Sequence, residues 1–193
     1  MTLYQKVRSV EKLFNELDAR ISDFQEKSGL HCLAGCGKCC YKPDIEATVL
    51  EFLPLAYHYY KSGIADLMYE KLKLKNLGIC HVFVQGTCDT NQGRCSEYVH
   101  RGLVCRLFGF SARKNKEGIN QLYTCRLIKE DQKEIFIHTS EEINSAVDVP
   151  MVKDYYQHLA AIDPGLGMEY YLINEAAWRA IGVVKGYYSY RLS

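Results

Sequence analysis

Hydrophobic residues in the first segment of the chain recur at alternating steps of four and three positions, with polar residues between them. They are Leu3, Val7, Val10, Phe14, Leu17, Ile21 and Phe24. This spacing places them along one face of an α-helix, which the Ser28-Gly29 step should end. Because fewer than four heptads are present, we expect this amphipathic helix, residues 1–28, to pack on the domain's own core. The alternative is a coiled coil with a protein partner.

Later segments predict further helices and two short strands. The helical segments are residues 43–61, which Pro54 should kink or interrupt, 64–75, 141–162, which Pro150 should interrupt, and 170–184. The strands are residues 79–84 and 119–125, and residues 85–94 between them should form a loop. Strands and helices do not alternate regularly along the chain. The pattern therefore predicts a mostly α fold, a single helical domain with little β, organised around a cysteine-ligated metal centre.

Length and composition agree with one globular domain, since the chain has 193 residues, of which 48% are hydrophobic and 24% charged. Within residues 1–193 we distinguish the N-terminal helix, a cysteine-rich region at 30–126 and C-terminal helices at 130–193. The formal charge of +1 disfavours a nucleic-acid partner. The sequence shows neither an apolar signal segment nor an apolar run that could span a membrane, so we expect a cytoplasmic location.

The chain carries nine cysteines, and four of them fall within the string HCLAGCGKCC. In a reducing cytoplasm such clustered thiols are more often metal ligands than disulfide partners. Cys36 and Cys39 form a C-x2-C turn whose two sulfurs can bind one metal. The side chains of Cys39 and Cys40 should point apart, because neighbouring residues diverge in helices and strands. We therefore expect two metals or one polynuclear cluster.

The arrangement of the cysteines resembles that of a known family. The string from Cys32 to Cys40 is followed by Cys80 in a short predicted strand, by Gly93 to Tyr98, and by Cys105 to Phe108. This combination resembles the YkgJ-type cysteine-cluster family (CxxCxxCC), a zinc- or iron-chelating domain, over roughly residues 30–126. Arg101-Gly102 departs from the Arg-Pro that the family usually has before its Cys-Arg step.

The resemblance implies a set of eight metal ligands. They are Cys32, Cys36, Cys39, Cys40, Cys80, Cys95, Cys105 and Cys125. Cys88 has no counterpart in the family motif and is left out of the set. The last four ligands are far apart in the sequence, so they must converge from separate elements.

Zinc and iron–sulfur clusters both suit ligation by thiolates alone. We favour an iron–sulfur cluster, of the 4Fe-4S type, because the chain has a single C-x2-C knuckle whereas structural zinc sites commonly use two. Eight matching cysteines would saturate the metal, which favours a structural, redox or sensing role. Flagellin lysine N-methylase, which resembles the family in its cysteine motif and uses a cluster with S-adenosylmethionine, supplies the alternative of a methyl-transferring enzyme.

Charged and imidazole side chains near the cysteines supply further candidates. Arg101 and Arg106, on either side of Cys105, are expected to stabilise the thiolates or the cofactor from beside the ligands. His31 and His81 adjoin cysteines, but adjacency alone does not make them ligands. The remaining histidines, which form no pair at metal-ligand spacing within one element, are His58, His100, His138 and His158. The sequence therefore indicates no histidine metal site.

Overall fold

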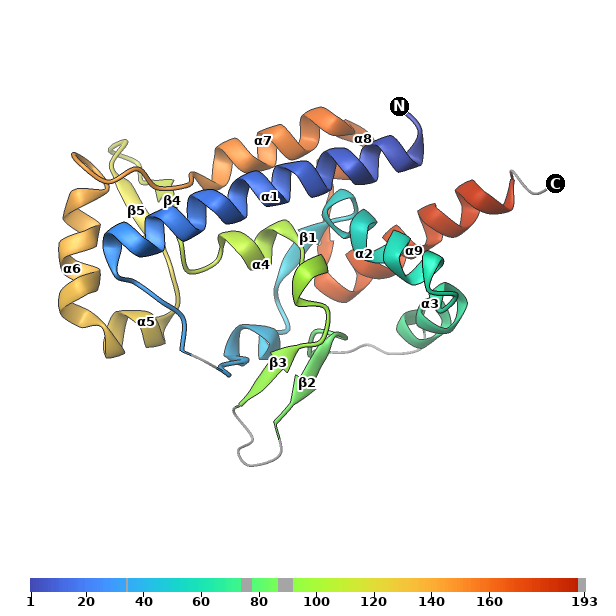
Figure 1. Ribbon diagram of the computed structural model, residues 1–193, viewed down its shortest axis with the longest axis horizontal. Coiled ribbons are helices and arrows are strands. Elements are labelled where there is room, and N and C mark those ends of the chain that lie inside the picture. Colours follow the sequence, from blue (N-terminus) through green and yellow to red (C-terminus); the bar gives the residue numbers. More distant parts are fainter. Residues whose placement is uncertain (34, 74–77, 87–91, 191–193) are drawn as a thin grey trace. The chain divides into compact units, whose positions relative to one another are not determined.

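The computed structural model describes residues 1–33, 35–73, 78–86 and 92–190 (Figure 1). Within these ranges the chain forms nine α-helices, which confirms the prediction of a mostly α fold. The helices are α1 (Leu3–Ser28), α2 (Leu53–Lys61), α3 (Ala65–Lys73), α4 (Leu103–Leu107), α5 (Arg126–Asp131), α6 (Lys133–Glu142), α7 (Val152–Ile162), α8 (Pro164–Gly167) and α9 (Ile173–Ser189). Three short 3-10 helices are η1 (Lys38–Tyr41), η2 (Leu50–Phe52) and η3 (Tyr98–His100).

The described strands form three antiparallel pairs. The strands are β1 (Glu46–Thr48), β2 (Phe83–Gln85), β3 (Gly93–Cys95), β4 (Ser111–Lys114), β5 (Asn120–Tyr123) and β6 (Tyr170–Leu172). β2 pairs with β3, with Phe83 opposite Cys95, and β4 pairs with β5, with Ser111 opposite Tyr123. β1 pairs with β6, from the other end of the chain, with Glu46 opposite Leu172.

The chain divides into two compact units. Unit 1 comprises Met1–Lys12, Gly35–Gly102 and Leu159–Ser193, and unit 2 comprises Leu13–Ala34 and Leu103–His158. The single domain over residues 1–193 stays a prediction.

In unit 1, α2 and α3 pack against α9, the long C-terminal helix drawn in red in Figure 1. The small residues Ala176, Ala177 and Ala180 on α9 are fully or almost fully buried, which allows the helices to approach closely. Tyr60 of α2 and Tyr188 of α9 stack with their ring centroids 4.5 Å apart. Unit 1 is therefore organised by a helical layer that also holds the β1–β6 pair.

Unit 2 has a hydrophobic core of its own. Its fully buried members are Phe24, Leu30, Ala112, Leu122, Ile128, Ile143 and Val149. The amphipathic stripe of α1 supplies Phe24 to this core, and the β4–β5 hairpin supplies Ala112 and Leu122. The predicted packing of the first helix on the protein's own core is thus confirmed for this part of the stripe.

Two predicted helices begin later than the sequence suggested, because their first residues are extended. Residues 43–52 form a turn, strand β1 and η2 rather than a continuous helix. Pro54 lies in the first turn of α2, where its missing N–H costs nothing, so it begins that helix rather than kinking it. Residues 170–172 form β6, and α9 starts only at Ile173. Pairing between β1 and β6 overrides local helical preference in both segments.

The other differences also have local causes. The predicted strand at residues 79–84 is limited to β2, because the backbone groups of Ile79 and His81 bond to a side chain of α9 instead of a strand. The predicted helix at 141–162 is interrupted, as Pro150 indicates, and α7 begins only at Val152. The segment starts with the end of α6, after which the amides of residues 145–147 all bond to the carbonyl of Glu142 and make a turn. The predicted strand at 119–125 is confirmed as β5, and its partner β4 was not anticipated.

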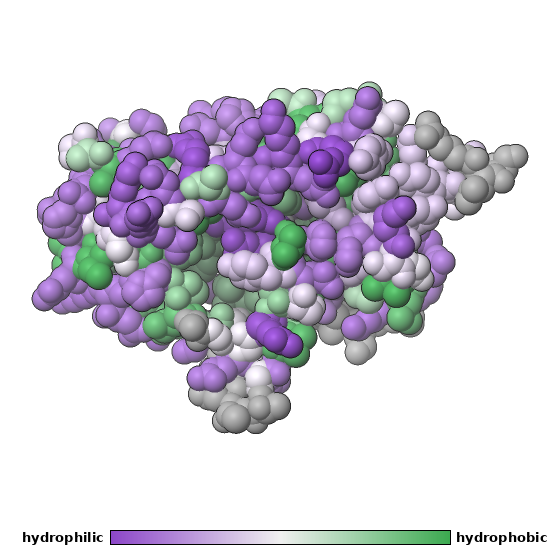
Figure 2. Space-filling view, viewed as in Figure 1, coloured by the Kyte–Doolittle hydropathy of each residue, from purple (hydrophilic) through white to green (hydrophobic). Residues whose placement is uncertain are grey.

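None of the described helices is long and apolar enough to cross a membrane. On the face drawn in Figure 2, hydrophobic side chains form small separate groups among hydrophilic ones.

Gly102, where the chain departs from the family's Arg-Pro step, packs against a buried carboxylate. Glu51 is fully buried and accepts hydrogen bonds from the backbone N–H of Thr48 at 2.7 Å and from its hydroxyl at 3.1 Å. A Cβ at position 102 would lie 2.8 Å from Glu51 Oε2 and 3.0 Å from Phe52 Cζ. The position therefore has no room for a side chain unless buried Glu51 moves.

Gly102→Ala should lower the free energy of unfolding by about 1–3 kcal/mol, because it overpacks this contact. Gly186→Ala is the matched control: no atom lies within 4 Å of the added Cβ, and the site is in α9. The control should raise the free energy of unfolding by roughly 0.5–1 kcal/mol, because alanine suits a helix better than glycine. Chemical denaturation of both variants measures this, and equal stabilities would contradict the packing argument.

Candidate metal centre

Backbone hydrogen bonds bring three thiol-bearing segments of unit 1 together. The segment that carries Cys36 forms a bridge to Gln92, and the N–H of Gly93 donates to the carbonyl of Gly35 at 3.0 Å. The N–H of Cys80 donates to the carbonyl of Cys40, also at 3.0 Å. The cysteine string, the Cys80 loop and the β2–β3 hairpin are therefore one assembly.

The ring of Phe83 fills the space between these segments. A Cβ on either Gly37 or Gly93 would overlap this ring. Tyr41 packs its ring edge-on to that of Phe83, with centroids 4.8 Å apart. Both glycines are therefore needed for the segment of Cys36 to Cys40 to pack against the β2–β3 hairpin.

Cys39 and Cys40 lie in η1, and their thiols are in contact. The thiol of Cys40 donates a hydrogen bond to the sulfur of Cys39, so the expected divergence of these neighbours does not hold. Rotation about the Cα–Cβ bonds lets two adjacent thiols meet on the outside of a short helix. This hydrogen bond, with help from backbone N–H groups and Arg101 and against the effect of burial, lowers the pKa of Cys39 to about 6.

Cys80 and Cys95 supply thiols on the inner side of the assembly. Cys80 is 7% exposed, and burial raises its pKa to about 11. Burial also raises the pKa of Cys95, and in both cases the neighbouring thiol groups, Cys39 among them, add to the increase. These sulfurs lie close enough to repel one another as thiolates.

Each of these sulfurs nevertheless receives a backbone hydrogen bond that favours the thiolate. Cys80 accepts from the N–H of Val82, and Cys95 accepts from the N–H of Glu97. Cys39 accepts from its own N–H and from that of Cys40. Such bonds stabilise bound thiolates, and a cation would remove the repulsion that arises when neighbouring thiols are deprotonated together. The donor set therefore fits a soft, thiolate-binding metal.

Arg101 is a positively charged side chain that acts electrostatically on the thiols of this assembly. It favours the thiolate forms of Cys39 and Cys95. Its guanidinium lies 4.1 Å from the centroid of the Tyr98 ring. Stacking on this ring limits the positions that the side chain adopts. A role for Arg101 beside the cofactor stays a prediction.

Asn174 of α9 holds the loop that carries Cys80. Its side-chain oxygen accepts a hydrogen bond from the backbone N–H of His81 at 2.8 Å and lies 3.1 Å from His81 Nδ1. Its amide donates to the carbonyl of Ile79 at 2.8 Å. Both neighbours of Cys80 are thus fixed by one side chain. Burial lowers the pKa of His81 to about 4, so its imidazole is neutral near pH 7.

The remaining predicted ligands belong to unit 2. Cys32 follows α1 and is exposed, and Cys105 lies within α4. Cys125 caps the N-terminus of α5, where its sulfur accepts a hydrogen bond from the N–H of Ile128 at 3.4 Å. Cys88 lies outside the described residues. The full set of eight ligands stays a prediction.

Arg106 has a clear structural role in unit 2. Its side chain is 4% exposed and forms an ion pair with Asp18 of α1. Its guanidinium also lies 4.5 Å from the centroid of the Phe14 ring. These contacts attach α4 to α1, and a role for Arg106 beside the cofactor stays a prediction.

Sequence reasoning missed one group of potential metal ligands. His58 of α2, Glu97 and His100 of η3 have ligand atoms that all lie within 4.8 Å of one another. The available signal was the Glu-x-x-His spacing of Glu97 and His100, which is known from metal sites on helices. The contribution of His58 could not be seen, because it comes from a distant helix.

The family comparison agrees with the thiol chemistry. A family model described as CxxCxxCC, "Putative zinc- or iron-chelating domain", matches residues 31–139, more than half of the chain. The protein belongs to the CxxCxxCC family. The family description indicates chelation of zinc or iron. No curated protein and no solved structure matches the chain.

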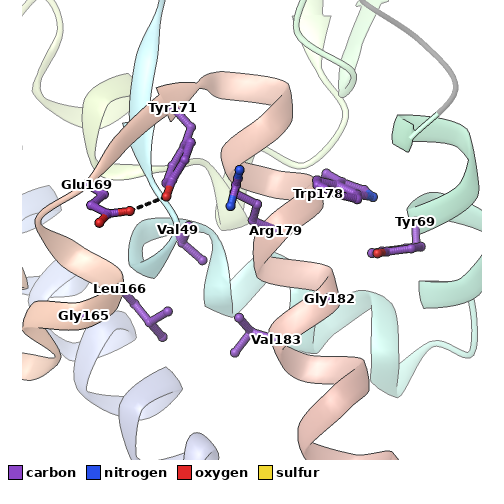
Figure 3. A pocket seen from close by; sticks show the side chains of 10 residues that line it. All are labelled: Val49, Tyr69, Gly165, Leu166, Glu169, Tyr171, Trp178, Arg179, Gly182 and Val183. Atoms are coloured by element: carbon purple, nitrogen blue, oxygen red, sulfur yellow. Dashed lines mark hydrogen bonds between the residues drawn. The ribbon is translucent and has the colours of Figure 1, made fainter.

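This CxxCxxCC protein also has a pocket of about 480 Å³ in unit 1, away from the cysteines (Figure 3). The residues described as lining it are Val49, Tyr69, Gly165, Leu166, Glu169, Tyr171, Trp178, Arg179, Gly182 and Val183. Polar side chains here pair with one another: the hydroxyl of Tyr171 donates to Glu169, and Arg179 lies 4.0 Å from the Tyr171 ring centroid. None of the described lining residues is a cysteine, so this pocket is separate from the thiol assembly.

Asn174→Ala should weaken metal binding by the CxxCxxCC protein, because the loop around Cys80 loses its anchor. We expect a loss of about 1–3 kcal/mol in unfolding free energy and about 10–100-fold in metal affinity. Asn115→Ala is the control. Asn115 similarly accepts two backbone hydrogen bonds, at 3.0 and 2.9 Å, but in the β4–β5 turn of unit 2. Chelator competition should show unchanged affinity in the control; an equal loss in both variants would contradict the role of Asn174.

Proposed function

We propose that this protein holds an iron–sulfur cluster of the 4Fe-4S type through cysteine thiolates, and that it serves a structural, redox or sensing role in the cytosol. The observation that carries the proposal is the assembly of Cys39, Cys40, Cys80 and Cys95 from three separate segments. Membership of a zinc- or iron-chelating family supports it. A reducing compartment would keep these thiols available to the metal.

The number of thiols favours a cluster over a single zinc ion. A structural zinc site uses four ligands, whereas unit 1 alone contributes Cys36 in addition to the four assembled thiols. The contact between the Cys39 and Cys40 thiols also suits a polynuclear centre, because two adjacent sulfurs fit around several metal atoms better than around one. Iron–sulfur ligation accounts for both features.

The chain's own residues would tune such a centre. Backbone N–H groups directed at the sulfurs and the guanidinium of Arg101 offset negative charge on the thiolates. Asn174 would keep the Cys80 loop in place during any change of charge. A bound cluster would supply one-electron transfer or structural cross-linking of the three segments.

Anaerobically reconstituted protein should contain iron and acid-labile sulfide, and Cys39→Ser and Cys80→Ser should each lose most of both. Cys88→Ser is the matched control, because Cys88 is absent from the predicted ligand set, and it should retain the wild-type content. Metal and sulfide analysis, with the visible absorption of the cluster, measures these outcomes. Zinc without sulfide in protein from iron-supplemented cells would contradict the iron–sulfur assignment while leaving the thiol site intact.

Cys125→Ser tests a ligand whose replacement should preserve the fold. Serine is itself a favourable N-cap, so α5 should keep its N-terminal hydrogen bond and its stability. We expect this variant to bind less iron than Cys88→Ser, while its metal-free form should unfold at the same temperature as metal-free wild type. Wild-type iron content would remove Cys125 from the ligand set and leave it as a helix cap.

A further inference from the structure

A cluster of imidazole and carboxylate groups lies beside the thiol assembly and is not part of it. Glu97 Oε2 is 3.4 Å from His100 Nδ1 and 3.9 Å from His58 Nε2. The two imidazole rings stack with centroids 4.3 Å apart and an interplanar angle of 19°. Both histidines therefore direct a ring nitrogen toward the same carboxylate oxygen.

These separations are long for hydrogen bonds, and the one between Glu97 and His100, a weak hydrogen bond, equals the spacing of two ligands on one metal. An N–H···O bond is usually about 2.7–3.2 Å long, and both contacts here are longer. Ligands that each lie about 2.0–2.1 Å from a tetrahedral metal are about 3.4 Å from one another. Glu97 and His100 already have this separation. His58, whose ring stacks on that of His100, would have to rotate about its side-chain bonds to direct Nε2 at the same ion.

The scaffold holds the three side chains in place while leaving them accessible. Tyr59, next to His58, is 2% exposed and anchors that turn of α2 in the core. Glu97 is fixed by its N–H, which donates to the sulfur of Cys95, and His100 follows one turn later at the end of η3. The side chains of His58, Glu97 and His100 are 40%, 24% and 25% exposed, so solvent metal can reach them.

We propose that His58, Glu97 and His100 form a second metal site, for a divalent first-row transition ion such as Zn²⁺ or Fe²⁺. Two imidazoles and one carboxylate are a donor set for borderline metals, distinct from the soft thiolates next to it. Three protein ligands leave at least one position for water or a substrate, as in catalytic rather than structural sites. This inference goes beyond the proposed function and does not depend on it.

The test uses the full-length protein after its thiolate centre has been filled by reconstitution. Zn²⁺ titrated into this protein should bind one further equivalent by calorimetry. Co²⁺ in its place should bind without the intense sulfur-to-metal charge-transfer absorption that thiolate sites give. This spectral difference keeps the result readable even if the thiolate centre proves to hold something other than an iron–sulfur cluster. Absence of a further equivalent in wild-type protein would overturn the proposal.

Variants test whether these residues bind the further equivalent of Zn²⁺. The double variant His58→Ala, His100→Ala should lose it, and Glu97→Gln should bind it at least about tenfold more weakly, since even loss of a residue behind the ligands costs about 10–100-fold. His138→Ala is the matched control, because His138 lies 3.0 Å from Glu142 on α6, outside this cluster. It should bind like wild type. An equivalent retained by the double variant would overturn the assignment.

A measurement on unaltered protein covers the case in which the double variant does not fold. Histidine-selective ¹⁵N spectra recorded with and without Zn²⁺ should show two ring systems changing to the metal-bound pattern. Assignment by the single variants His58→Gln and His100→Gln should identify these two residues. Changes confined to other histidines would overturn the site.

Discussion

Repulsion between neighbouring thiolates is the constraint on which the rest of this structure depends. Cys80 and Cys95 have raised pKa values because they are buried and lie near other thiols, including that of Cys39. The fold nevertheless directs backbone N–H groups at the same sulfurs. Backbone N–H groups thus favour the thiolate forms, whereas burial and the neighbouring sulfurs disfavour them. A bound cation would relieve this conflict and would couple metal binding to the folding of unit 1.

The assembly is held by backbone pairing rather than by a large apolar core. Cys36, Cys40 and the β2–β3 hairpin are connected through main-chain bonds, with the Phe83 ring packed on two glycines. Asn174 extends this support to α9, which is itself packed on α2 and α3. The thiol segments are thus connected through Asn174 to the packed helices α2, α3 and α9. A change of charge at the sulfurs could therefore alter the packing of those helices.

Two kinds of donor lie next to each other along one short segment. Cys95 ends β3 and Glu97 precedes η3, so a soft sulfur and a hard carboxylate oxygen are two residues apart. Tyr59 experiences the charge of both, since burial first and then Glu97, Cys80 and Cys95 raise its pKa.

The sequence by itself determined the long first helix, the helical class of the fold and the family, because each depends on a periodic or closely spaced local pattern. The stripe from Leu3 to Phe24 defines α1, and the cysteine string defines the family match. Only the tertiary structure decided where β1 and β6 replace helix, since their pairing joins segments far apart in the chain. It also decided that the Cys39 and Cys40 thiols meet, and that His58 reaches Glu97 and His100. The first contact depends on side-chain rotation within η1 and the second on packing between distant elements, and periodicity and spacing encode neither.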